Sequence, residues 1–166
     1  MQPSLRQYAD YFSICLLLGL CLPNEVIAWV DKHIEESDDP SDWMIELSAS
    51  ATKHPLDIIH LLDLVPGTKD LEVSLRLSIA KLGDVYPTLL PEHGQKAQPK
   101  HRQLFSNLYS LVLEHDELSN DIRGDIFQIY QYLDCVEQGY GNWSIIQLDY
   151  EELLAVGNSY KEWINF

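Results

Sequence analysis

Basic residues are scarce in this sequence of 166 residues. Lysine and arginine number 11, against 26 aspartates and glutamates, so the formal net charge is −15. Residues 1–65 and 116–166 each have a net charge of −8, whereas residues 66–115 have a net charge of +1. Without a basic patch to neutralise phosphates, we expect direct binding neither to nucleic acid nor to an anionic membrane. A field of this sign attracts cationic proteins, although it also serves solubility.

Cysteines and long apolar runs are scarce as well. Cys15, Cys21 and Cys135 are too few for a disulfide framework and fit reduced thiols in a cytoplasmic protein. The longest apolar stretch, within residues 12–22, is too short to span a bilayer. Arg6 is the only basic residue before it, so we expect a buried helix rather than a signal peptide.

Catalytic motifs are also missing. No serine stands in a nucleophile elbow, and no glycine-rich phosphate loop follows a predicted strand. Asp57 and His60 form an acid–x–x–His pair, but a di-iron helix bundle needs a second copy. We therefore expect no catalytic residue, no metal and no cofactor, and a protein that binds a partner instead of acting as an enzyme.

Apolar residues recur at helical spacing through most of the chain, and prolines, glycines and capping residues mark the boundaries. This pattern predicts one all-α domain over residues 1–166, with seven or eight helices packed as stacked helical hairpins in a solenoid-like bundle. Residues 84–99 are expected to be irregular, with a short helical turn. The predicted helices cover residues 5–20, 24–37 with Asn24 as N-cap, a short segment around 43–47, 56–65, 69–83, 100–115, 120–138 with Ser119 as N-cap, and a last helix from Asp149 or Tyr150 to Trp163.

One segment carries a conflicting pattern. In residues 71–79 every second residue is apolar, which is the periodicity of a strand. A lone strand among helices would leave its backbone unpaired, and the only plausible pairing segment, 144–150, is far along the chain. A helix buried on two sides also fits, so we predict a helix over 69–83 with Thr68 as its N-cap.

Two groups of acidic residues lie beside aromatic residues. The first follows the end of the helix predicted over 24–37, where negative charge opposes the helix dipole, and such an uncompensated local cost points to function. The second lies where the last helix is predicted to begin, where acids also suit the dipole. Rings supply desolvated anchors and carboxylates receive Arg or Lys, although the same rings also fit an ordinary core. The candidate partner-binding residues are Asp31, Glu35, Asp38, Asp39, Asp42 and Trp43 in the first group, and Trp143, Asp149, Tyr150, Glu151 and Glu152 in the second.

A family resemblance runs through residues 23–83, in the segments Pro23–Asp31, Lys32–Ser37, Trp43–Ser48, Pro55–Ile59 and Leu75–Leu77. These segments resemble small helical bacterial proteins encoded beside polymorphic toxins, including the immunity proteins of contact-dependent growth inhibition. The final third of the chain is similar to them in its helical character and acidity.

The resemblance implies a cytoplasmic inhibitor that binds one cognate toxin domain as a heterodimer and blocks its active site. Many toxins of this kind are nucleases with active clefts lined by Lys and Arg, so the implied partner is a cationic nuclease domain, such as a ribonuclease. From the residues alone, the alternative is a non-catalytic helical scaffold or adaptor that binds basic proteins.

Overall fold

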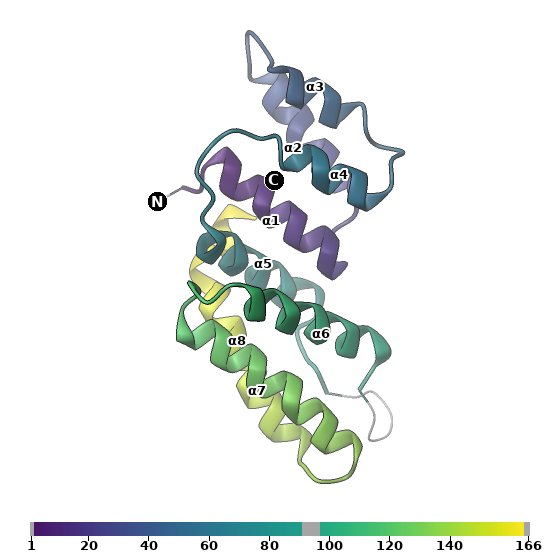
Figure 1. Cartoon of the computed structure of the whole chain (residues 1–166), viewed down its shortest axis with the longest axis vertical. Coiled ribbons are helices and arrows are strands. Elements are labelled where there is room, and N and C mark those ends of the chain that lie inside the picture. The colour runs from purple at the N-terminus through teal and green to yellow at the C-terminus, as the bar shows by residue number, and fades with distance from the viewer. Residues whose placement is uncertain (1, 91–96, 165–166) are drawn as a thin grey trace. The chain divides into compact units, whose positions relative to one another are not determined.

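A computed structural model describes residues 2–90 and 97–164 of the protein (Figure 1). Over these residues the structure is helical without any β-strand, which confirms the predicted all-α class. The solenoid-like stacking of hairpins stays a prediction. The elements are α1 (Leu5–Leu18), α2 (Pro23–Glu35), α3 (Asp42–Ser48), α4 (Pro55–Leu62), α5 (Leu71–Val85), α6 (Pro99–Glu114), α7 (Asn120–Glu137), α8 (Trp143–Gly157) and the 3-10 helix η1 (Asn158–Trp163).

Helix α5 resolves the conflicting periodicity in favour of a helix. Its apolar residues Leu75, Leu77 and Ile79 are buried, but so are the intervening Ser74 and Ser78. Each serine hydroxyl donates a hydrogen bond to the carbonyl oxygen four residues earlier, at 2.9 Å in both cases. The helix is therefore buried on more than one side, and small polar residues on the buried surface imitate the alternation of a strand.

The chain packs as two compact units. The first comprises residues 1–78 and 163–166, the second comprises residues 79–162, and the boundary falls inside α5. Their net charges are similar, −8 for the first and −7 for the second. The expectation of one domain over the whole chain stays a prediction.

In the first unit, α2 packs against α3, and α4 packs against both α1 and α3 (Figure 1). Most of the apolar run seen in the sequence lies in α1, where its side chains other than that of Leu17 are largely buried as expected. Phe12 of α1 contacts Trp29 of α2, with ring centroids 5.2 Å apart. Gly19 ends α1 in the left-handed conformation, with φ of 68°, and the amide of Leu20 donates to the carbonyl of Cys15 at 2.8 Å.

Arg6 of α1 holds the end of α4. Its side chain is buried, and Nη1 donates to the carbonyl oxygens of Leu62, Asp63 and Val65 at 3.0, 3.1 and 2.9 Å. The last carbonyls of a helix lack partners within the helix, so the guanidinium satisfies groups that burial would otherwise leave unpaired. Nη2 forms an ion pair with Asp10 one turn along α1, which balances the buried charge.

In the second unit, α7 packs against both α6 and α8 (Figure 1). At the end of α8, Gly157 is buried, and a Cβ there would lie 2.5 Å from the backbone nitrogen of Ala80 in α5. Only glycine permits this approach of the two backbones. The core of the three C-terminal helices comprises Leu104, Phe105, Leu108, Val112, Ile122, Ile126, Ile129, Leu133, Ile146, Tyr150 and Leu153.

Two predicted N-caps were wrong. Helix α2 begins at Pro23, and the amide of Leu22 donates to Glu25 Oε2 at 2.8 Å, so Asn24 lies inside the helix. At the start of α5 it is Asp70, not Thr68, whose carboxylate accepts the amide of Val73 at 3.1 Å. Ser119, in contrast, is the N-cap of α7 as predicted.

The predicted start of the last helix was also wrong. Helix α8 begins at Trp143, and the side chain of Asn142 caps it by accepting the amide of Ser144 at 3.0 Å. Its regular part ends at Gly157, and η1 follows. Asp149 therefore lies in the middle of α8. The apolar residues after Asn142 also fit a strand that could pair with residues 71–79. This alternative reading obscured the helix start at Asn142.

Of the irregular stretch predicted over 84–99, residues 86–90 and 97–98 are irregular, and residues 91–96 lie outside the described residues. Among the helices formed by the described residues, none combines the length and the apolar character needed to cross a membrane.

Candidate partner-binding surfaces

The first acidic group predicted from the sequence lies on α2, α3 and the loop between them. Glu35, Asp38, Asp39 and Asp42 are exposed, and we call these four residues the α2–α3 acidic group. Asp31 differs, because its carboxylate is half-buried and accepts a hydrogen bond from the Ser48 hydroxyl. That bond joins α2 to α3, so Asp31 has a structural role here.

Trp43 lies beside this group and is half-buried. Its ring contacts Trp29, with centroids 6.4 Å apart and planes at 31°. Trp29 in turn contacts His33, with centroids 5.1 Å apart. Because packed rings fix its position, the exposed part of Trp43 is a rigid apolar surface at the edge of four carboxylates.

The second acidic group is rearranged relative to the prediction. Asp149 of α8 accepts a hydrogen bond from Gln128 of α7 at 3.1 Å, which places it at the junction of the two helices. Asp125 of α7 has a raised pKa, first because of burial and then because of Glu152, Asp121 and Asp149. Four carboxylates from two helices therefore come close together. We call Asp121, Asp125, Asp149 and Glu152 the α7–α8 acidic cluster.

Sequence analysis missed Asp121 and Asp125. A signal was present, because two acids four residues apart lie on the same face of the helix predicted over 120–138. Like charges at this spacing destabilise a helix by a few tenths of a kcal/mol. Burial raises the pKa of Asp125 most, and repulsion from Glu152, Asp121 and Asp149 raises it further, so the fold tolerates the cluster at a local cost.

Two other predicted members of the second group lie apart from the cluster. Glu151 accepts a hydrogen bond from Gln147 at 3.0 Å, and Gln147 also accepts the amide of Leu89. Glu151 is two residues from Asp149 and so lies on another side of α8. Trp143 is half-buried in the first turn of the helix.

Tyr150 had been predicted to bind the partner, and the structure corrects this. Its ring is fully buried, packs edge-on against Phe105 at 6.0 Å, and its hydroxyl donates to the carbonyl of Tyr86. Burial raises its pKa. Tyr150 is a core residue with a satisfied hydroxyl, so it offers no contact surface. Tyr140, shortly before α8, is 82% exposed.

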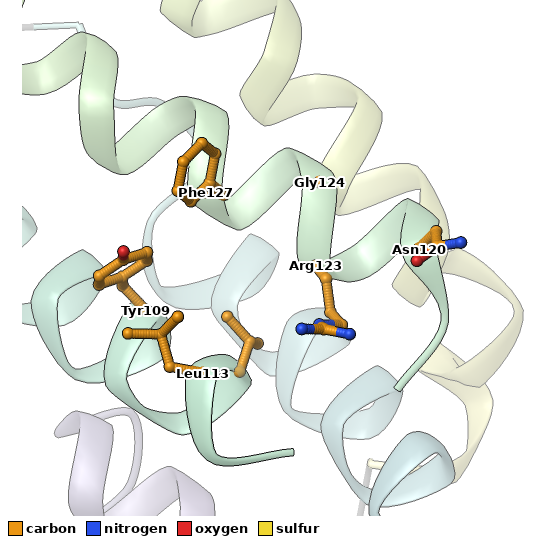
Figure 2. A pocket seen from close by; sticks show the side chains of 7 residues that line it. Tyr109, Leu113, Asn120, Arg123, Gly124 and Phe127 are labelled. Carbon is orange, nitrogen blue, oxygen red and sulfur yellow. The ribbon is translucent and has the colours of Figure 1, made fainter. Parts of the chain in front are cut away.

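A groove lies between α6 and α7 in the same unit. It has a volume of about 310 Å³, and Figure 2 shows Tyr109 and Leu113 on α6 facing Phe127 and Arg123 on α7. Tyr109 is fixed by stacking on Tyr130, with centroids 4.4 Å apart and planes at 10°. We call this the α6–α7 groove. Among the described residues, its lining consists of Tyr109, Val112, Leu113, Asn120, Arg123, Gly124 and Phe127.

The apolar surface of the groove extends along α7. A neighbouring hollow of about 340 Å³ shares Phe127 and continues to Tyr132 and Cys135. Leu113, Phe127 and Tyr132 are 57%, 42% and 39% exposed, so this surface is both apolar and accessible to solvent. The sequence pattern could not reveal this exposed apolar surface. The stripe of α7 that faces the core is by itself enough to explain why the segment is read as a helix packed on one side.

The described residues offer no group of three or more His, Cys, Asp or Glu side chains that could hold a metal. Comparisons with protein-family models, with curated proteins and with solved structures give no match to this chain.

Proposed function

We propose that this protein is an immunity protein, a cytoplasmic inhibitor that binds a cationic toxin domain and blocks its active site. The observation that carries the proposal is the convergence of four carboxylates in the α7–α8 acidic cluster, where Asp125 has a raised pKa. Two helices place like charges together, and local costs of this kind concentrate at functional surfaces. A positively charged partner would remove the repulsion.

Charge alone accounts for fast capture but not for tight binding. Exposed ion pairs contribute only about 0–1 kcal/mol each, whereas complementary fields raise association rates toward roughly 10⁸–10⁹ M⁻¹s⁻¹. Slow release needs buried apolar anchors. Trp43 beside the α2–α3 acidic group and the α6–α7 groove beside the α7–α8 acidic cluster both supply such surfaces.

A nuclease toxin suits this combination. A nuclease cleft carries Lys and Arg to hold phosphate, so an acidic surface can occupy the cleft in place of nucleic acid. Rapid capture matters because the cell must neutralise the toxin before its RNA or DNA is cut. The resemblance over residues 23–83 to immunity proteins of contact-dependent growth inhibition motivates the choice of a toxin as the partner.

A second candidate is an adaptor that binds several basic proteins. Acidic surfaces on both units favour it, because each unit could hold a separate partner. The two functions differ in selectivity. An immunity protein binds one cognate domain with high affinity, whereas an adaptor binds unrelated cationic proteins weakly and with a steep dependence on salt.

The test begins with the toxin-like protein encoded by the neighbouring open reading frame. Its nuclease activity and its affinity for this protein are measured with the wild-type chain and with the double variant Asp125→Lys/Asp149→Lys. The expected result is inhibition by the wild type and affinity lowered at least about tenfold in the variant. The matched control is Glu46→Lys/Asp57→Lys, because both acids are exposed residues of the first unit outside the acidic groups.

A triple reversal of Asp38, Asp39 and Asp42 to Lys tests the α2–α3 acidic group in the same assay. If reversal of neither acidic surface changes affinity, the electrostatic mechanism is wrong. Equal binding of unrelated basic proteins, such as cytochrome c and lysozyme, would favour the adaptor instead.

A further inference from the structure

Gly124 is unexplained by the fold of the free protein. It lies in the interior of α7, where glycine is less favourable than alanine. Its φ is not positive, and a Cβ added there would meet no atom within 4 Å. Neither backbone conformation nor internal packing therefore requires a glycine at this position. Gly124 lines the α6–α7 groove, where the absence of a side chain leaves backbone open to an approaching molecule (Figure 2).

The groove has the form of a helix-binding site. It runs between two packed helices, and its walls include Leu113 from α6 and Phe127 from α7 (Figure 2). Amphipathic helices bind such grooves through apolar residues at positions i, i+3, i+4 and i+7. A glycine on the wall permits close approach of the partner backbone, as small residues do where helices meet.

The charges around the groove define the partner. Asp116 and Glu117 lie in the connection between α6 and α7, and Asp121 and Asp125 lie on α7 itself. Arg123, which lines the groove, donates to the carbonyl of Asp116 at 3.2 Å. It also contributes, after a backbone hydrogen bond and His115, to the lowered pKa of Glu117. The segment 116–125, which supplies Asn120, Arg123 and Gly124 to the lining, has four acids and one arginine and therefore a net charge of −3.

A second copy of this chain is a poor occupant, because it would bring a further net charge of −15 to an acidic surface. A basic partner gains from the same field. We propose that the α6–α7 groove binds an amphipathic, basic helix of the partner, whose backbone passes over Gly124. This inference rests on the proposed function in that the partner is a cationic protein, and it adds the structural form of the contact.

A synthetic peptide tests the groove directly on the full chain. The probe is an 18-residue, fluorescein-labelled helix of Leu, Ala and Lys, with Leu at i, i+3, i+4 and i+7 spacing and Lys elsewhere on its flanks. One control peptide has the same composition in shuffled order, and another carries Glu in place of Lys. Fluorescence anisotropy at two salt concentrations measures binding. We expect the wild-type protein to bind the amphipathic basic peptide in preference to both controls.

Two substitutions at Gly124 separate stability from binding. Gly124→Ala should raise the melting temperature by about 2–4 °C, since the position is open and alanine favours the helix. Gly124→Leu should weaken peptide binding about tenfold or more, because the side chain occupies the path of the ligand backbone. Leu113→Ser should also weaken binding, by removing an exposed wall of the groove. Ser110→Leu is the matched control, an added side chain on the exposed surface of α6 outside the groove lining.

The outcomes separate this inference from the proposed function. If Gly124→Leu and Leu113→Ser bind the peptide like the wild type, or the wild type binds no peptide, the groove is not the contact. The toxin assay with Asp125→Lys/Asp149→Lys then still decides the proposed function. Equal binding of the Glu-containing peptide would overturn the basic character assigned to the partner.

Discussion

Replacing Arg6 by methionine should severely destabilise the first unit. Arg6→Met keeps the apolar stem of a buried side chain but removes the guanidinium, which donates to three carbonyl oxygens at the end of α4. It also leaves the mostly buried carboxylate of Asp10 without its cation. Breaking a buried pair by removing one partner destabilises a protein by about 3–5 kcal/mol. We expect a loss in this range, which is a large fraction of the stability of a small domain.

Urea unfolding measures this loss. With a denaturant slope of about 2 kcal/mol/M, a loss of 3–5 kcal/mol lowers the transition midpoint by roughly 1.5–2.5 M. Circular dichroism follows helix content, and the fluorescence of Trp29, which is buried in the first unit, reports the local packing. Lys69→Met is the matched control, because Lys69 also bonds Asp63, at 3.1 Å, but both side chains are exposed. That substitution should change stability by at most about 1 kcal/mol.

A second substitution checks the electrostatic part of the reasoning. Asp10→Leu in the Arg6→Met background removes the buried carboxylate that has lost its cation, so it should recover part of the lost stability, on the order of 1–4 kcal/mol. A loss below about 1 kcal/mol for Arg6→Met, or one equal to that of Lys69→Met, would refute the role given to Arg6. Failure of Asp10→Leu to restore stability would assign the loss to the carbonyl contacts instead.

Three further substitutions have defined outcomes. The pKa of Asp125 is raised in the folded state, so its ionised form destabilises the fold. Asp125→Asn should therefore be more stable than wild type at pH 7. Thermal melts at a series of pH values should show this difference vanish below the ordinary Asp pKa of 3.8. Gly157→Ala should destabilise the second unit by about 1–3 kcal/mol or more, since its Cβ would lie 2.5 Å from Ala80, and a normal melting temperature would contradict this. Tyr150→Phe should lose about 1 kcal/mol in chemical denaturation, because the carbonyl of Tyr86 loses its donor.

Helix positions were largely predictable because their boundaries are encoded locally. Pro23, Pro55 and Pro99 each begin a helix, and the turn after α7 includes Gly139 in the left-handed conformation, with φ of 83°. For α5, the choice between helix and strand depended on residues such as Ser74, whose hydroxyl bonds to the backbone inside a buried helix. Whether a polar residue in an alternating pattern is buried is a tertiary property, so periodicity alone left two alternatives.

The candidate surfaces were less predictable because they depend on contacts between helices. The α7–α8 acidic cluster requires the register that places Gln128 beside Asp149, and this register is set by core packing of α7 on α8. Burial of Tyr150 follows from the same packing. The sequence shows Arg6 only as the single basic residue before an apolar run, yet the carbonyl oxygens that it binds lie more than 50 residues away. A single sequence carries no record of these pairings.

The true start of α8 changes what its acids imply. At the first turn of a helix, Asp149 and Glu152 would be ordinary partners of the helix dipole. The helix begins at Trp143, so Asp149 lies beyond the first turn, where the dipole effect has faded. The helix dipole therefore does not account for Asp149 and Glu152, whereas the hydrogen bond from Gln128 gives Asp149 a contact between α7 and α8.

Helix α7 connects the two surfaces of the second unit. Its buried stripe includes Ile122, Ile126 and Ile129, which leaves the remainder of its circumference to the α6–α7 groove and to the α7–α8 acidic cluster. Gly124 and Asp125 are consecutive, so they point in directions about 100° apart around the axis of α7. A basic helix that lies along α7 can therefore put apolar residues into the groove on one side and cations against the carboxylates on the other. This arrangement predicts that Asp125→Lys alone weakens binding of the basic peptide, and that the double variant with Gly124→Leu binds more weakly than either single variant, since one ligand contacts both sites. Unchanged peptide binding by Asp125→Lys would mean that the ligand does not reach the cluster.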